Sequence, residues 1–212
     1  MAPSTALWSF ALVVGLLTLT PGLDTALVLR TSALGHRRRA WGVVLGIQTG
    51  TLLWGALTSV GVTALLTASQ VAYTALRWAG AAYLVWTGVR MLRATFGNGP
   101  APEAAAPDSR PAPDTARGGW RQGTLTNLLN PKMGAFYVAL LPQFIPPGTN
   151  HVAMGLLLTS VHIALGLVWS SVLIACARAL RGRLSRPSAR RLLDRVTGTV
   201  VAAFGIRLAF GD

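Results

Sequence analysis

The chain has 212 residues, of which 52% are apolar and only 12% are charged, yet its formal net charge is +13. A soluble domain of this size rarely combines such apolarity with so strong a basic excess, so the composition indicates a membrane protein. The basic residues are dispersed among short connections instead of forming one face with stacking aromatics, which argues against a nucleic-acid partner. A single cysteine, Cys176, allows no internal disulfide and suggests no metal cluster.

Six apolar segments approach the length of about 20 residues that a helix needs to cross the hydrocarbon of a bilayer. We therefore predict an all-α membrane protein with six transmembrane helices, contacting the lipid bilayer along its length. The predicted spans are residues 5–29, 40–67, 71–91, 123–145, 152–177 and 196–210. The last span is the shortest, so five spans are the alternative.

The first and fourth spans each contain a proline next to an ionisable residue. Asp24 follows Pro21 and Gly22, and Lys132, the only lysine of the chain, directly follows Pro131. Proline supplies no N–H and disrupts a helix, so we predict that both spans are broken. In transporters such breaks present backbone groups to substrates and ions. A simple kink, which membrane helices tolerate, is the alternative.

Ionisable groups inside the bilayer indicate function, because placing one near its centre costs roughly 2.5–3.5 kcal/mol on insertion scales. Such residues usually pair or face a wet cavity. For Lys132 the alternative is a side chain that snorkels to the interface. We expect Asp24 and Lys132 to face one cavity, and this pattern is typical of a transporter.

Arginine placement predicts the orientation, since short cytoplasmic connections accumulate Lys and Arg. The connection from Pro146 to His151 has neither. Three other connections, those between spans one and two, three and four, and five and six, are rich in arginine and are predicted to be cytoplasmic. Those arginines are Arg30, Arg37, Arg38 and Arg39, then Arg90, Arg93, Arg110, Arg117 and Arg121, then Arg178, Arg181, Arg183, Arg186, Arg190, Arg191 and Arg195. With six spans, both termini are predicted to lie outside.

The proline-rich segment 97–120 is predicted to be a cytoplasmic linker without fixed structure. It divides one transmembrane domain, 1–212, into repeat 1 (1–96) and repeat 2 (121–212). Three spans in each half force the halves into opposite orientations, so inverted repeats are expected.

Further polar and small residues lie within the spans. Gly42, Gly46 and Gly50 form a flat ridge suited to close helix packing, within one chain or between two copies, so a homo-oligomer is possible. Gln48 could line the cavity or bond to a neighbouring helix. His162 could relay protons near neutral pH or be a satisfied structural histidine.

Four motifs, taken together in order and spacing, resemble the LysE/RhtB amino-acid exporters over nearly the whole chain. They are Thr20-Pro21-Gly22-Leu23-Asp24, the glycine-rich run from Gly42 to Gly50, the run from Arg77 to Leu84, and the run from Asn127 to Lys132. The sequence departs from the family pattern at Leu23, where a second proline is usual, and at Arg77, where lysine is commoner.

The resemblance implies a translocator that exports amino acids from the bacterial cytoplasm across the inner membrane, driven by the proton gradient. We hypothesise that the substrate ammonium approaches Asp24 and its carboxylate approaches Lys132. Asn127 and Asn130 would supply neutral hydrogen bonds. Protonation of Asp24 would give one route to coupling with protons.

Other classes of function fit the sequence less well. An intramembrane enzyme would need several catalytic groups within the spans, and only Asp24 and His162 are available. A non-transporting scaffold would leave the two charges beside prolines unexplained. Efflux of a cation or another small metabolite is the stronger rival, although a cation carrier should contain more buried carboxylates. No cofactor motif is present in the sequence.

Overall fold

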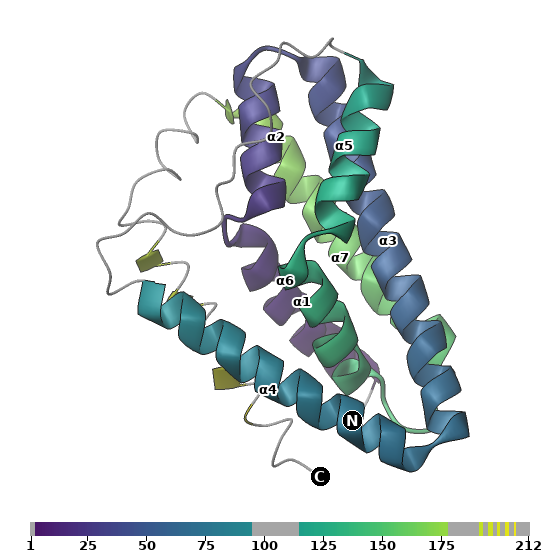
Figure 1. Ribbon diagram of the computed structural model, residues 1–212. Coiled ribbons are helices and arrows are strands. Elements are labelled where there is room, and N and C mark those ends of the chain that lie inside the picture. The colour runs from purple at the N-terminus through teal and green to yellow at the C-terminus, as the bar shows by residue number, and fades with distance from the viewer. Residues whose placement is uncertain are drawn as a thin grey trace.

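The computed structural model describes residues 3–94 and 115–177, together with the isolated residues 191, 192, 195, 196, 199, 202, 203 and 206. Within these residues the regular structure is entirely helical (Figure 1). The whole predicted sixth span, 196–210, and most of the predicted linker, 97–120, lie outside the two continuous ranges. The predicted all-α class is confirmed for the part of the chain that is described.

The first predicted span is broken, as the sequence indicates. Helix α1 (Pro3–Leu19) and helix α2 (Leu23–Ala33) are bent by 52° at the short connection that contains Pro21. The two helices continue one another around this break (Figure 1). Because proline cannot donate the backbone hydrogen bond that would continue α1, the chain changes direction here.

The second and third predicted spans each form one long helix, α3 (Arg37–Ala68) and α4 (Gln70–Ala94). The fifth forms α7 (His151–Ala175), capped by the Asn150 side chain, which accepts a hydrogen bond from the Ala153 N–H. Among the described residues, α3, α7 and the bent pair α1–α2 are long and apolar enough to cross a membrane.

The fourth predicted span is divided into several pieces. Helix α5 (Ala116–Leu128) is followed by α6 (Pro131–Ala135), a π-helical turn η1 (Phe136–Leu140) and a 3₁₀ turn η2 (Leu141–Phe144). The break before Pro131 confirms that this span is interrupted. The irregular turns after α6 were not predicted; π-helical turns of this kind often occur at functional sites.

The predicted linker extended too far, because α5 begins inside it. Thr115 caps this helix by accepting a hydrogen bond from the Gly118 N–H. A cap of this type supplies an acceptor for one of the orphan donors at a helix start. The glycines that follow pack against α3, and this contact outweighs their poor intrinsic helix propensity. The linker prediction is therefore wrong for residues 116–120.

Glycines bring α3 and α5 into close contact along their lengths, and the two helices lie side by side in Figure 1. A methyl group on Gly42 or Gly46 would collide with the α5 backbone at Ala116 and Trp120. Reciprocally, one on Gly123 would collide with the Val43 carbonyl of α3. The predicted packing role of the Gly42–Gly50 ridge is therefore confirmed within one chain. The matching glycines of α5 were not predicted.

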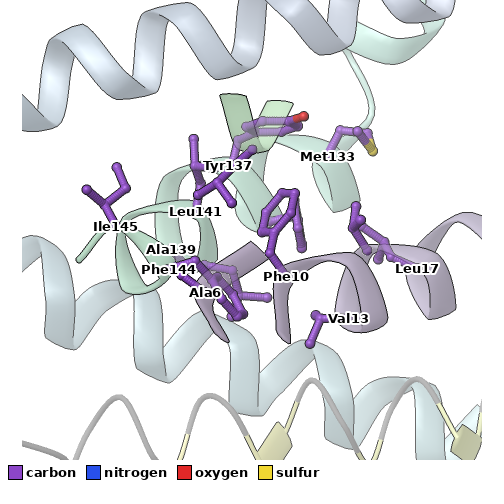
Figure 2. Packing of buried hydrophobic residues seen from close by; sticks show 14 of the residues in the cluster. Ala6, Phe10, Val13, Leu17, Met133, Tyr137, Ala139, Leu141, Phe144 and Ile145 are labelled. Atoms are coloured by element: carbon purple, nitrogen blue, oxygen red, sulfur yellow. The ribbon is translucent and has the colours of Figure 1, made fainter. Parts of the chain in front are cut away.

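A buried apolar cluster joins α1 to the irregular end of the fourth span. Phe10 of α1 lies against Phe136 and Phe144, with ring centroids 5.9 and 5.4 Å apart. Figure 2 shows Phe10 and Leu17 on α1 pointing toward the segment that carries Met133 and Tyr137. This cluster fixes the end of α1 next to α6, where both broken spans meet.

The glycine contact between α3 and α5 can be tested with Gly46→Ala. The added methyl group would overlap the Trp120 carbonyl, so we expect the free energy of unfolding to fall by about 1–3 kcal/mol, as for other overpacked sites. Thermal unfolding of the purified protein in detergent measures the change. Gly61→Ala, on the same helix with no atom within 4 Å of the new methyl group, is the matched control. Equal melting temperatures for the two variants would contradict the close packing.

Candidate functional site

A pocket of about 70 Å³ lies where the two broken spans meet α3 and α7. One water molecule needs roughly 10–15 Å³ on this measure, so the pocket has room for several. Seven residues predicted from the sequence line it: Gly22, Asp24, Gln48, Asn127, Asn130, Lys132 and His162. The other two predicted residues, Pro21 and Pro131, lie at the breaks beside it. The fold therefore brings together side chains that are more than a hundred residues apart in sequence.

Asp24 lies in the first turn of α2, at the end of the helix dipole that favours negative charge. Its Oδ2 accepts a hydrogen bond of 2.9 Å from Asn127 Nδ2. Because a carboxylate only accepts, this bond fixes the orientation of the Asn127 amide. Asn127 is fully buried at the end of α5, so the bond ties the first broken span to the second.

Lys132 lies in the first turn of α6 and extends toward the end of α1. The Asn130 side chain caps α6 by accepting a hydrogen bond of 3.1 Å from the Lys132 backbone N–H. At the other end of the lysine, Nζ donates to the carbonyls of Leu17 at 3.3 Å and Thr20 at 3.4 Å. The cation therefore binds the carbonyl end of α1 at the proline break.

The contact between Lys132 Nζ and the Leu17 carbonyl arises because residue 21 is a proline. In an uninterrupted α-helix the Leu17 carbonyl would accept from the backbone N–H four residues later, which is position 21. Pro21 has no N–H, so that bond cannot form. A buried carbonyl needs a donor, and Lys132 Nζ supplies one. Two observations that were separate in the sequence, Pro21 and Lys132, thus belong to one interaction.

His162 of α7 is buried and hydrogen-bonds through Nδ1 to the Tyr137 hydroxyl at 3.0 Å. The two rings stack with centroids 5.8 Å apart and an interplanar angle of 11°, while Phe136 meets His162 edge-on. Tyr137 lies in the π-helical turn η1. Tyr137 was not predicted from the sequence. A buried tyrosine hydroxyl usually needs a hydrogen-bond partner, and this rule could have pointed to Tyr137.

Gln48 lies on α3 opposite Gly166 of α7, and both line the pocket. A methyl group on Gly166 would come within 2.9 Å of Gln48 Nε2, so this glycine makes room for the glutamine. Trp169 and Ser170 continue the same wall, one turn further along α7. Trp169 was not predicted, because nothing in the sequence indicates which tryptophan, with its indole N–H donor, lines the pocket.

The described part of the chain contains no group of three His, Cys, Asp or Glu residues that could hold a metal ion. The polar groups of the pocket are instead one carboxylate, one ammonium, carboxamides, hydroxyls, backbone carbonyls, the His162 imidazole and the Trp169 indole. This set pairs an anion with a cation and adds neutral hydrogen-bonding groups. It suits a small molecule that carries both charges.

Comparison with known proteins shows similarity along almost the full length. Residues 5–211 match the family described as LysE type translocator. A homoserine/homoserine lactone efflux protein of Salmonella typhimurium is 32% identical over 206 residues, which cover 95% of this chain and 96% of the relative. A threonine efflux protein of Escherichia coli is 29% identical and covers 90% of each chain. An uncharacterized membrane protein of Vibrio cholerae is 29% identical and covers 95% of each. No solved structure gives a significant match.

The bond between Tyr137 and His162 can be tested with Tyr137→Phe, which removes only the hydroxyl. Because His162 Nδ1 would lose its partner in a buried site, we expect the free energy of unfolding to fall by about 1–3 kcal/mol. Thermal unfolding in detergent is the measurement. Tyr83→Phe on α4, where the side chain is partly exposed beside Trp86, is the control and should change little. Identical losses for the two variants would contradict a specific stabilising role of the hydrogen bond.

Proposed function

Because the chain belongs to the LysE type translocator family, we propose that it exports amino acids or close derivatives from the bacterial cytoplasm in exchange for protons. The observation that carries the proposal is the pocket at the two helix breaks, which both Asp24 and Lys132 line. Family membership makes the chain a membrane translocator and not an enzyme. The relatives named for homoserine and threonine efflux support amino acids as the substrate class.

An amino acid matches the two charges of the pocket. Its ammonium is placed near Asp24 and its carboxylate near Lys132, so the zwitterion compensates both groups during its passage. Asn127 and Asn130 lie beside these charges, and carboxamides can both donate and accept hydrogen bonds. A free charge in the bilayer is costly, so a site with matched charges lowers the barrier to transfer.

Proton coupling is assigned to Asp24. When the carboxylate binds a proton, it loses the negative charge that attracts the substrate ammonium. Substrate release toward the outside and proton uptake from the outside would then accompany each other. The reverse exchange on the cytoplasmic side resets the carrier. In the absence of substrate, Asp24 and Lys132 compensate each other within the pocket.

The proposed architecture has six spans in the inner membrane, arranged as two inverted repeats with both termini outside. The described helices overlap the first five predicted spans, and three of them, α3, α7 and the bent pair α1–α2, are long and apolar enough to cross a membrane. Discontinuous helices that meet at a central site are typical of inverted-repeat carriers. A carrier of metal cations is less well supported, since Asp24 is the one carboxylate among the described pocket residues.

The exporter function predicts that Lys132→Ala abolishes most transport. Loss of a charge-assisted interaction of about 1.5–3 kcal/mol corresponds to a roughly ten- to hundredfold lower rate. Efflux of labelled threonine and homoserine, within a mixed set of amino acids, is followed from proteoliposomes with and without an imposed proton gradient. Arg121→Ala removes an exposed positive charge from α5 and should export as wild type does. If the wild type moves no amino acid, the function is not amino-acid export.

Coupling through Asp24 predicts a distinct result for Asp24→Asn. Asparagine cannot change its charge, so we expect its residual efflux to show no stimulation by the proton gradient at any pH. Wild-type efflux should be stimulated, and the ratio of the two rates with and without a gradient is the measurement. Wild-type rates in Asp24→Asn at several pH values would exclude this residue as the coupling site.

The proposed orientation can be read from cysteine accessibility. Cys176 lies within the predicted fifth span, so it is replaced by alanine. In this background Arg38→Cys places an exposed thiol in the arginine-rich connection that is predicted to be cytoplasmic, and a membrane-impermeant maleimide should label it only in permeabilised cells. In the same background, Pro147→Cys places a thiol in the exposed connection before α7. This thiol should react in intact cells. The opposite pattern would invert the topology.

A further inference from the structure

We propose that the Leu17 and Thr20 carbonyls form the subsite for the substrate's ammonium group, and that Lys132 occupies this subsite as a tethered substitute when no substrate is bound. The inference rests on the proposed function in one respect, namely that the substrate carries an ammonium group. It identifies the two backbone carbonyls that form this binding site, whereas the sequence indicated only that a proline break exposes backbone groups.

The lysine ammonium group occupies the subsite in the structure. Lys132 Nζ lies 3.3 Å from the Leu17 carbonyl oxygen and 3.4 Å from that of Thr20. A lysine side chain ends in a primary alkylammonium group with three N–H donors, and an amino acid carries the same group on its α-carbon. Carbonyls that accept hydrogen bonds from one ammonium group can therefore accept them from the other.

The subsite arises from the break at the end of α1. Both carbonyls belong to the last turn of α1 or to the break that follows, where the helix dipole places partial negative charge. Pro21 removes the backbone donor for Leu17, so the acceptor faces the pocket instead of continuing the helix. Leu17, Thr20 and Asp24 all line the pocket. Positive charge is thus favoured at this one break by two carbonyl dipoles and a nearby carboxylate.

Exchange of Lys132 for a substrate would preserve the hydrogen bonds of the two carbonyls. When the substrate ammonium displaces Lys132 Nζ, the carbonyls keep a charged donor and no buried acceptor loses its partner. The displaced Lys132 can then turn to the substrate carboxylate. Binding of the substrate and release of the lysine become one coupled event, in which the number of charge-assisted hydrogen bonds is maintained.

The subsite also sets a requirement on the substrate. The two carbonyls need N–H donors, so primary ammonium groups should bind and quaternary ammonium groups, which have no N–H, should not. An N,N,N-trimethylated amino acid keeps the same charges but lacks the donors. It should therefore be rejected, although simple charge complementarity with Asp24 would accept it.

Chemical rescue of Lys132→Ala tests the subsite directly. The substitution deletes the atoms of a propylammonium ion, so added propylammonium should refill the carbonyl site and raise the melting temperature of the variant by a few degrees at saturating concentration. Tetramethylammonium at equal concentration controls for ionic strength and should have no effect. Wild type, whose site is filled by Lys132, should show no shift with either ion. Equal shifts with both ions, or no shift in a variant that melts cooperatively, would overturn the proposal.

A second measurement on the wild type applies even if Lys132→Ala does not fold. Unlabelled threonine should compete with efflux of labelled threonine, whereas N,N,N-trimethylated threonine should compete at least tenfold less well. Equal competition would overturn the carbonyl subsite while leaving the exporter function intact. Conversely, rescue of Lys132→Ala by propylammonium in a protein that exports no amino acid would support the subsite and overturn the proposed function.

Discussion

The absence of a backbone N–H at Pro21 is the constraint on which the site depends. In an apolar environment every backbone carbonyl needs a donor, because water is not there to supply one. The chain meets this need with Lys132 Nζ, which comes from the other half of the sequence and reaches the carbonyls of Leu17 and Thr20. One interaction therefore satisfies the broken helix, places the only lysine and joins the two halves at the pocket. The same interaction marks the position that we propose for exchange with a substrate ammonium group.

The rest of the fold supports this junction by bringing helices unusually close. Gly46 of α3 and Gly123 of α5 allow each backbone to lie against the other without intervening side chains. This close approach sets the depth of Asn127 at the end of α5, and from there its amide reaches Asp24. On the opposite side, Gly166 of α7 leaves space for Gln48. Small residues thus determine where the polar residues of the pocket lie, although they make no polar contact themselves.

The second broken span contributes rigidity as well as charge. Its π-helical turn places Tyr137 next to His162, and the hydrogen bond between them closes the wall of the pocket on the side of α7. The apolar cluster around Phe10 holds the same turn against α1. A movement of α6 during transport would therefore displace Lys132 and alter the contacts with His162 and with the end of α1 at the same time. Such shared contacts suit a carrier in which two broken helices must change position in concert.

The sequence by itself determined the helical membrane class, the breaks at Pro21 and Pro131, and the charged, amide and histidine side chains that line the pocket. These follow from local rules: apolar length, the missing N–H of proline and the cost of an isolated charge in a bilayer. It failed at the start of α5, where contact with α3 extends the helix into the predicted linker. It also could not find Tyr137, Trp169 or the two carbonyls of α1. Pro21 leaves the Leu17 carbonyl without its helical donor. Only the tertiary structure decides which group replaces that donor, because Lys132 lies 115 residues away in sequence.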